Sequence, residues 1–164
     1  MKPRSLTLRA LRKDDEALLR AVAPSFARWS RAPKRTLAAL TAAPGAETWV
    51  AEAGDEALGL VTLSLEDIAA PSFGPFESPR VARIDAVGVA PAARRQGIAR
   101  ELLATAEARA RARGAVVITL MTAVSNAPAR RLFARVGYLP VLRQPRAYAN
   151  GEDAIEMFRL IATG

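Results

Sequence analysis

The sequence predicts an α/β (α+β) protein with a mixed, mostly antiparallel sheet of six to seven strands flanked by about four helices. Two observations carry this prediction. Residues 81–121 read as a strand, an amphipathic helix and a second, continuously apolar strand, and such a unit makes a right-handed crossover between parallel strands. Short strands joined by tight turns flank this unit on both sides, and hairpins of that kind pair in an antiparallel manner.

The order of the elements follows from the alternation of apolar and polar residues and from the positions of turn residues. The expected strands cover residues 5–9, 48–52, 58–65, 81–89, 115–121, 138–142 and 154–160. The expected helices run from Asp14 or Asp15 toward Pro24, and over residues 34–43, 97–113 and 127–136, with one of the two aspartates as the cap of the first helix. No repeat or linker interrupts this order, so residues 1–164 are expected to form a single domain.

Cysteine and histidine are both absent from the 164 residues. Their absence excludes disulfides, cysteine nucleophiles, serine–histidine triads and the common zinc sites, so no bound metal is expected. A catalyst in this chain must use carboxylates, hydroxyls, amides, cationic groups or the backbone. No segment is apolar enough for a signal peptide or a membrane helix, and we therefore expect a cytoplasmic protein with no membrane association.

The net charge of +8 comes almost entirely from arginine. One interpretation is a polyanionic partner, either a nucleic acid or a phosphorylated cofactor. The other is codon usage, because a GC-rich genome produces many Arg and Ala residues and few Lys residues. The arginines are scattered instead of forming one block, which argues against nucleic acid as the partner.

The loop Arg94-Arg95-Gln96-Gly97-Ile98-Ala99 separates a strand from the long helix. Backbone N–H groups at the start of a helix have no internal partners and bind phosphate oxygens well. Gly97 permits unusual dihedral angles and a close approach of the ligand, and Arg94, Arg95 and Arg100 add positive charge. The loop therefore suits a pyrophosphate, with an ordinary surface turn before a helix as the alternative interpretation.

Two sequence patterns resemble those of the GNAT family of N-acetyltransferases. The first is Val87-x-Val89-x-Pro91 followed by Arg94-x-x-Gly97-x-Ala99. The second is Asn126-x-x-Ala129-x-x-Leu132-Phe133-x-x-x-Gly137-Tyr138. They stand at the separation usual in that family, with a helix and a strand between them. The resemblance implies a GNAT-like acyl-CoA N-acyltransferase fold and acetyl-CoA (coenzyme A) as the cofactor.

The resemblance also implies roles for individual residues. Backbone groups of the strand that holds Val87 and Val89 would bind the pantetheine arm, amides from Arg95 to Arg100 would bind the pyrophosphate, and Asn126 would contact the arm from the other side. The cofactor-binding residues expected in this way are Val87, Val89, Arg94, Arg95, Gln96, Gly97, Ile98, Ala99, Arg100, Asn126 and Phe133.

Gly88 and Asn126 each have a purely structural interpretation beside the functional one. Gly88 suits a β-bulge or a close backbone approach, and it is equally explained as a packing glycine. Asn126 is also a good N-cap, with Pro128 in the first turn of the helix, and that role is compatible with cofactor binding.

Asp85 is the candidate catalytic base. Simple alternation along the strand places it on the same face as Val87 and Val89, and its position resembles that of the catalytic glutamate in histone-acetylating members of the family. An unperturbed Asp has a pKa of about 3.9 and would need desolvation or a water chain to act as a base. The alternatives are an ion pair with Arg80 or Arg83 and a role in orienting the amine.

These observations predict an acyltransferase that moves an acetyl group from acetyl-CoA to a primary amine of a small molecule, amino acid or peptide, by direct attack in a ternary complex. The N–H of Val87 is the expected oxyanion donor. Many relatives have a tyrosine that protonates the leaving thiolate at the position of Phe133. Tyr138 is expected to be a core aromatic and Tyr148 is the other tyrosine, so the thiolate would take its proton from water. The alternative is a non-catalytic acyl-CoA-binding module or sensor.

The resemblance implies that the amine substrate enters between the N-terminal helices and the loops that join strands. The candidate residues there are Phe26, Arg28, Trp29, Arg31, Asp67, Phe73, Phe76 and Glu77. Asp67 or Glu77 would hold a cationic amine, and Arg28 or Arg31 a carboxylate; ordinary surface positions are the alternative for each. The aromatic residues would belong either to the core or to a contact between the subunits of a homodimer.

Overall fold

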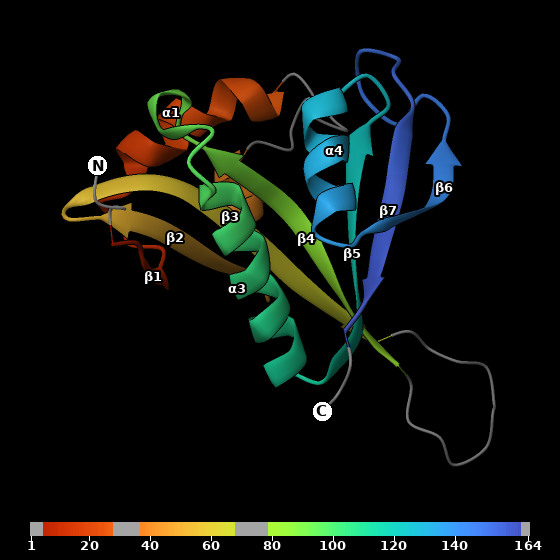
Figure 1. Ribbon diagram of the computed structural model, residues 1–164, viewed down its shortest axis with the longest axis horizontal. Helices are drawn as coiled ribbons and strands as arrows, with labels where there is room; N and C mark the ends of the chain where they lie inside the picture. Colours follow the sequence, from red (N-terminus) through yellow and green to blue (C-terminus); the bar gives the residue numbers. More distant parts are fainter. Residues whose placement is uncertain (1–4, 28–36, 68–78, 162–164) are drawn as a thin grey trace.

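A computed structural model describes residues 5–27, 37–67 and 79–161 (Figure 1). The strands are β1 (Thr7–Ala10), β2 (Glu47–Ala53), β3 (Glu56–Asp67), β4 (Arg80–Val89), β5 (Ala115–Ala123), β6 (Leu139–Gln144) and β7 (Ala154–Leu160). The helices are α1 (Glu16–Ala27), α2 (Leu37–Thr41), α3 (Ile98–Ala112) and α4 (Ala127–Arg135), with a 3₁₀ turn at Pro91–Ala93.

The strands form one seven-stranded sheet in the order β1-β2-β3-β4-β5-β7-β6. Every strand pairing among the described residues is antiparallel except that of β4 with β5, which is parallel and is connected through α3. The mixed sheet and its flanking helices confirm the fold class predicted from the sequence.

Helices cover both faces of the sheet. Figure 1 shows α3 and α4 on the face toward the viewer, where Leu102 and Phe133 belong to one large hydrophobic cluster with residues of β3, β4 and β5. On the opposite face, Leu18 of α1 and Leu40 of α2 pack with Leu60 of β3 in a second, smaller cluster. The sheet is therefore buried from both sides around β3 and β4, where the cofactor was expected.

The first helix departs from the prediction at both ends. It continues past Pro24 to Ala27, so the proline does not terminate it. Asp15 directly precedes the helix, but its carboxylate accepts hydrogen bonds from both terminal nitrogens of Arg9 at 2.8 Å and from the Arg12 amide at 2.7 Å. The Arg9 guanidinium holds the pKa of Asp15 below its ordinary value. Asp15 thus compensates a half-buried arginine and fixes the chain that enters α1.

A β-bulge lies at Asp85. Thr62 and Leu63 are consecutive on β3, but they pair with Ala86 and Ile84 on β4, so Asp85 is the extra residue. The prediction that Asp85 shares a face with Val87 by simple alternation is therefore wrong, because the bulge changes the alternation: Ile84 and Val87 both pack in the cluster beneath α3.

Gly88 is a close approach and not a bulge, since the pairing with β3 is regular on both sides of it. A Cβ atom at Gly88 would lie 2.3 Å from Cγ1 of Val22 on α1, which is far inside van der Waals contact. This glycine lets α1 rest directly on β4. The bulge and the close approach together shape the part of β4 that borders the cleft described below.

Tyr138 is the predicted core aromatic, and its hydroxyl has no hydrogen-bond partner among the described residues. Desolvation, and then the negative charge of Glu107, raises the pKa of Tyr138 well above its ordinary value. A buried polar group without a partner costs free energy, so Tyr138→Phe should raise the free energy of unfolding by about 1 kcal/mol. Urea denaturation of the two proteins measures this difference. A clearly less stable variant would contradict the assignment of the hydroxyl as unsatisfied.

Candidate active site

β4 and β5 diverge soon after they begin to pair. Their backbone pairing extends from Arg80 with Ala115 to Arg83 with Thr119 and stops there. Beyond Arg83, β4 is paired with β3 on one edge only, so the backbone groups of its other edge are available to a ligand. This divergence opens the sheet between the start of α3 and the start of α4.

A cleft of about 990 Å³ occupies this opening. Its walls come from α1, β4, the loop before α3, β5, α4 and β7. The predicted site residues that line it are Asp85, Val87, Val89, Arg94, Arg95, Gly97, Ile98, Ala99, Arg100, Asn126 and Phe133. Gln96 is exposed and does not belong to the lining residues. The structure thus brings residues from two distant sequence patterns into one cleft.

The loop before α3 has the backbone shape of an anion cradle. Arg95 and Gly97 both have positive φ angles, 62° and 80°, and Gly97 is the N-cap of α3 without any side-chain cap bond. The first amides of α3 are therefore left for another acceptor. Successive residues that alternate between ordinary and left-handed conformations turn their N–H groups into one concavity, which favours an anion.

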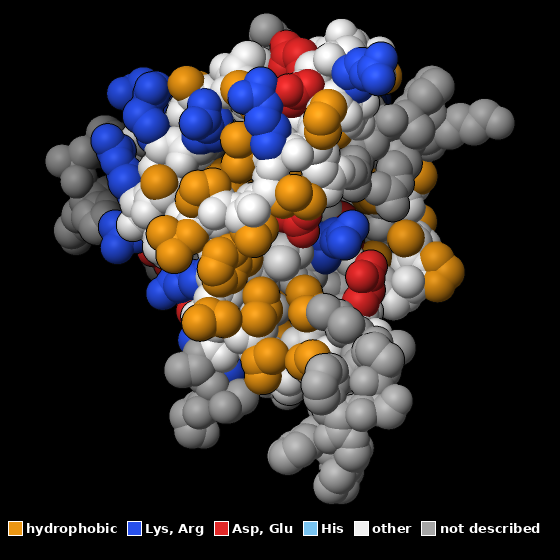
Figure 2. Space-filling model, turned by 90° about the vertical axis from the view of Figure 1, so that its right-hand side faces the viewer, with side chains coloured by type: hydrophobic (Ala, Val, Ile, Leu, Met, Phe, Trp, Pro, Cys, Tyr) orange, Lys and Arg blue, Asp and Glu red, His pale blue; other side chains and the backbone are white. Residues whose placement is uncertain are grey.

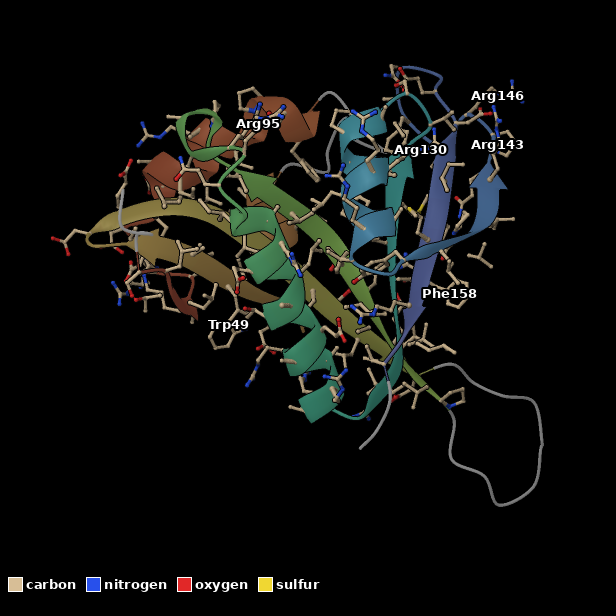
Figure 3. The ribbon with its side chains drawn as sticks, in the orientation of Figure 1. Trp49, Arg95, Arg130, Arg143, Arg146 and Phe158 are labelled. Carbon is tan, nitrogen blue, oxygen red and sulfur yellow. The ribbon has the colours of Figure 1, made fainter. Side chains whose placement is uncertain are left out.

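Arginine side chains surround this cradle. Arg94 is fixed by its Nη2, which donates to Ser25 Oγ at 2.6 Å, and by its Nε, which donates to the carbonyl of Val89 at 3.3 Å. Arg95 and Arg100 are exposed, and neither has an ion pair with a carboxylate in the described part of the chain. Figure 3 shows Arg95 near the N-terminal end of α3. Positive charge that is not already compensated is what the phosphates of coenzyme A require.

The middle of the cleft is apolar and narrows between the two strands. Val87 and Val89 of β4 face it from one side, and Leu132 and Phe133 of α4 line it from the other. Asn126 begins α4, and its Oδ1 accepts a hydrogen bond from the Ala129 amide at 3.4 Å, which confirms the N-cap. An apolar channel with amide groups along its walls fits a flexible pantetheine arm.

Asp85 lines the cleft from the bulge of β4 and is half-buried. The two arginines that were alternative partners for it contact other carboxylates. Arg80 donates from its Nε to Asp67 Oδ1 at 2.8 Å, and the Nη2 of Arg83 lies 3.8 Å from Glu66 Oε2.

Phe133 is buried, and its ring packs edge-on against Tyr138 with 6.1 Å between the centroids. It supplies shape to the cleft and no proton. Two residues that the sequence did not assign to the site also line the cleft, Tyr148 from the loop between β6 and β7 and Glu156 from β7. Glu156 could have been suspected as the one acidic residue of a mostly apolar strand.

The residues expected to hold the substrate differ in whether they line the cleft. Phe26 lines the cleft from α1, whereas Asp67 is bonded to Arg80 and lies outside the lining. The other candidates, Arg28, Trp29, Arg31, Phe73, Phe76 and Glu77, lie outside the described residues. In the described ranges, no three potential metal ligands come together. No helix in those ranges is long and apolar enough to cross a bilayer.

Comparisons with known proteins agree with this geometry. The family model described as acetyltransferase (GNAT) family matches residues 15–138, whereas no curated protein sequence matches the chain. Arabidopsis thaliana NAA60 in complex with acetyl-CoA has a TM-score of 0.77 at 19% identity, covering 96% of this chain and 99% of that one. The ribosomal-protein-S18-alanine N-acetyltransferase of Escherichia coli has a TM-score of 0.68 at 20% identity, covering 98% and 96%.

A third solved structure is Chaetomium thermophilum Naa20 in complex with a bisubstrate analogue, with a TM-score of 0.69 at 25% identity, covering 96% of this chain and 87% of that one. The family model spans most of the chain and includes both sequence patterns that line the cleft. The chain therefore belongs to the GNAT family of acetyltransferases.

Proposed function

We propose that the chain transfers the acetyl group of acetyl-CoA to a primary amine by direct attack within a ternary complex. One observation carries the proposal: a single cleft joins an anion cradle, an apolar channel with an unpaired strand edge, and a half-buried carboxylate. These parts match the phosphates, the pantetheine arm and the reacting end of the cofactor, in that order. Acetyl-CoA supplies an activated thioester, so the protein needs no nucleophile of its own, which agrees with the absence of Cys and His.

Two groups of the chain would act at the reacting end. Asp85 takes a proton from the substrate ammonium, either directly or through water, so that the neutral nitrogen can attack the carbonyl carbon. The N–H of Val87, on the strand edge that faces away from β3, donates to the thioester oxygen as it gains negative charge. The carbon–sulfur bond breaks, the nitrogen that has attacked releases its surplus proton to water, and the thiolate takes a proton from water because Phe133 has no hydroxyl to give.

One of the compared structures is a ribosomal-protein-S18-alanine N-acetyltransferase, whose substrate is a protein. A peptide α-amine is accordingly one substrate class to test, beside amino acids, polyamines and other small amines. Thiol release from acetyl-CoA in the presence of each class measures the activity, and a calorimetric titration measures binding of the cofactor. We expect tight cofactor binding and amine-dependent thiol release with at least one class.

A non-catalytic acyl-CoA sensor is the second candidate, and Phe133 is the observation that favours it. Its ring is buried where a proton donor would stand, so a binding module would lose nothing by having it. Such a protein would bind coenzyme A in the same titration but would release no thiol with any amine. The two measurements together distinguish an enzyme from a sensor.

We also propose that the protein forms a homodimer. The supporting surface is the edge strand β6, where Leu139, Val141 and Leu142 are 60%, 59% and 53% exposed. Figure 2 looks toward this edge and shows hydrophobic side chains gathered across the middle of the face, with Lys and Arg side chains along its upper part. Open strand edges and contiguous apolar surface favour association with another chain. Light scattering of the protein in solution measures its mass directly.

A further inference from the structure

A row of residues crosses the sheet at the end of the cleft where the amine would react. Arg83 of β4 pairs with Thr119 of β5, and two residues further on, Met121 of β5 pairs with Glu156 of β7. Directly paired residues of neighbouring strands project from the same face. Asp85 lies in the bulge of β4 two residues beyond Arg83, and all five residues line the cleft. The cleft therefore holds two carboxylates at this end, one from β4 and one from β7, the strands on either side of β5.

Glu156 is half-buried, and the only hydrogen bond that its side chain makes in the described part of the chain is from a neutral group. Gln144 Nε2 on β6 donates to its Oε2 at 3.2 Å, and no described arginine or lysine pairs with it. Other half-buried carboxylates of this arginine-rich chain are paired: Glu52 contacts Arg9, and Glu107 contacts Arg159. A carboxylate that is half-buried without a cation retains a strong preference for one.

The charges of the cleft are thus separated. Arg95 and Arg100 lie at the end that suits phosphates, and Asp85 and Glu156 lie beyond the apolar channel. Among the described residues, Arg83 is the cationic side chain that lines the end of the cleft with the two carboxylates. Its Nη2 also lies 3.8 Å from Oε2 of Glu66, which does not line the cleft. An anionic cofactor and a cationic substrate would therefore each meet the complementary end.

We propose that Glu156 determines substrate specificity by binding a second positive charge of the substrate while the reacting amine lies near Asp85. The inference rests on the proposed acetyl transfer and names its substrate class, aliphatic diamines and polyamines. β4 and β7 lie on either side of β5 in the sheet, and Asp85, Met121 and Glu156 from these three strands all line the cleft. An extended alkyl chain with an amino group at each end can place one amino group near each carboxylate, and Met121 of β5 offers it an apolar surface.

The test compares diaminohexane with hexylamine, which differ only in the second amino group. Wild-type protein should acetylate the diamine with a kcat/KM at least about tenfold higher, and Glu156→Gln should remove this preference mainly by raising KM for the diamine. Glu152→Gln is the matched control, because it removes the same charge from a neighbouring residue that bonds Ser125 and does not line the cleft. It should keep the wild-type preference. Thermal unfolding confirms that both variants fold.

Binding of the same two amines to the CoA-loaded protein, followed by calorimetry, separates this inference from the proposed function. Tighter binding of the diamine that Glu156→Gln abolishes supports the inference even if no acetyl transfer occurs. Equal behaviour of the two amines with wild-type protein overturns it, and so does a preference that survives in Glu156→Gln. A protein that acetylates amines without distinguishing them would keep the proposed function and lose this inference.

Discussion

Replacing Gly97 by valine should weaken binding of coenzyme A by about tenfold or more. Gly97 has a φ of 80° at the N-cap of α3, a conformation that costs a residue with a Cβ about 1–2 kcal/mol. A β-branched residue that relaxes away from this conformation also turns the first amides of α3 out of the cradle. No heavy atom lies within 4 Å of a Cβ built at this position, so the expected effect comes from the backbone and not from crowding. Isothermal titration calorimetry with coenzyme A measures it.

Gly114→Val provides the control for this substitution. Gly114 stands at the opposite end of the same helix with a φ of 82°, and a Cβ there also meets nothing within 4 Å. The two variants should lose similar amounts of stability, but only Gly97→Val should lose affinity for coenzyme A. Equal affinities in the two variants would mean that the loop before α3 does not hold the phosphates.

Asp85→Asn should lower kcat by about a hundredfold, because general-base catalysis by a positioned side chain typically contributes at least that much. The amide has the same shape as the carboxylate but cannot take the proton of the ammonium. The variant should also lose the dependence of kcat on the ionisation of an acidic group, so its rate should rise with pH as free amine becomes available. Steady-state kinetics across a pH series measures both effects, and affinity for coenzyme A should stay unchanged.

Asp55→Asn is a suitable comparison, since Asp55 lies in the turn between β2 and β3 and is exposed. It should behave as wild type. If Asp85→Asn instead raised KM and left kcat unchanged, Asp85 would orient the amine without accepting its proton. Wild-type kinetics in Asp85→Asn would remove the residue from the mechanism altogether.

Features with local causes could be predicted from the sequence. The start of α3 depends on Gly97 and on the amphipathic helix that follows, and the structure places both as expected. The N-cap by Asn126 is likewise a contact between residues three apart. The parallel pairing of β4 with β5 follows from the length of the connection through α3.

Features that depend on the register between strands could not be predicted in this way. The bulge at Asp85 exists because Thr62 and Leu63 of β3 pair with Ala86 and Ile84, and no residue pattern within β4 itself predicts it. Glu156 enters the cleft because it pairs with Met121, a residue more than thirty positions away. The ion pair of Asp15 with Arg9 likewise connects β1 to the start of α1. The Asp15 carboxylate bonds this distant arginine, a role that differs from the simple helix cap expected from the sequence.

The central claim is direct transfer from bound acetyl-CoA to an amine, and a single-turnover experiment tests it most directly. Protein is mixed with an equal amount of acetyl-CoA, an accepted amine is added, and the products and the intact protein are followed by mass spectrometry. We predict that acetylated amine and free coenzyme A appear together at the same rate while the mass of the protein stays unchanged. An acetylated protein that forms before the product, or bound acetyl-CoA that persists with every amine, would contradict this account.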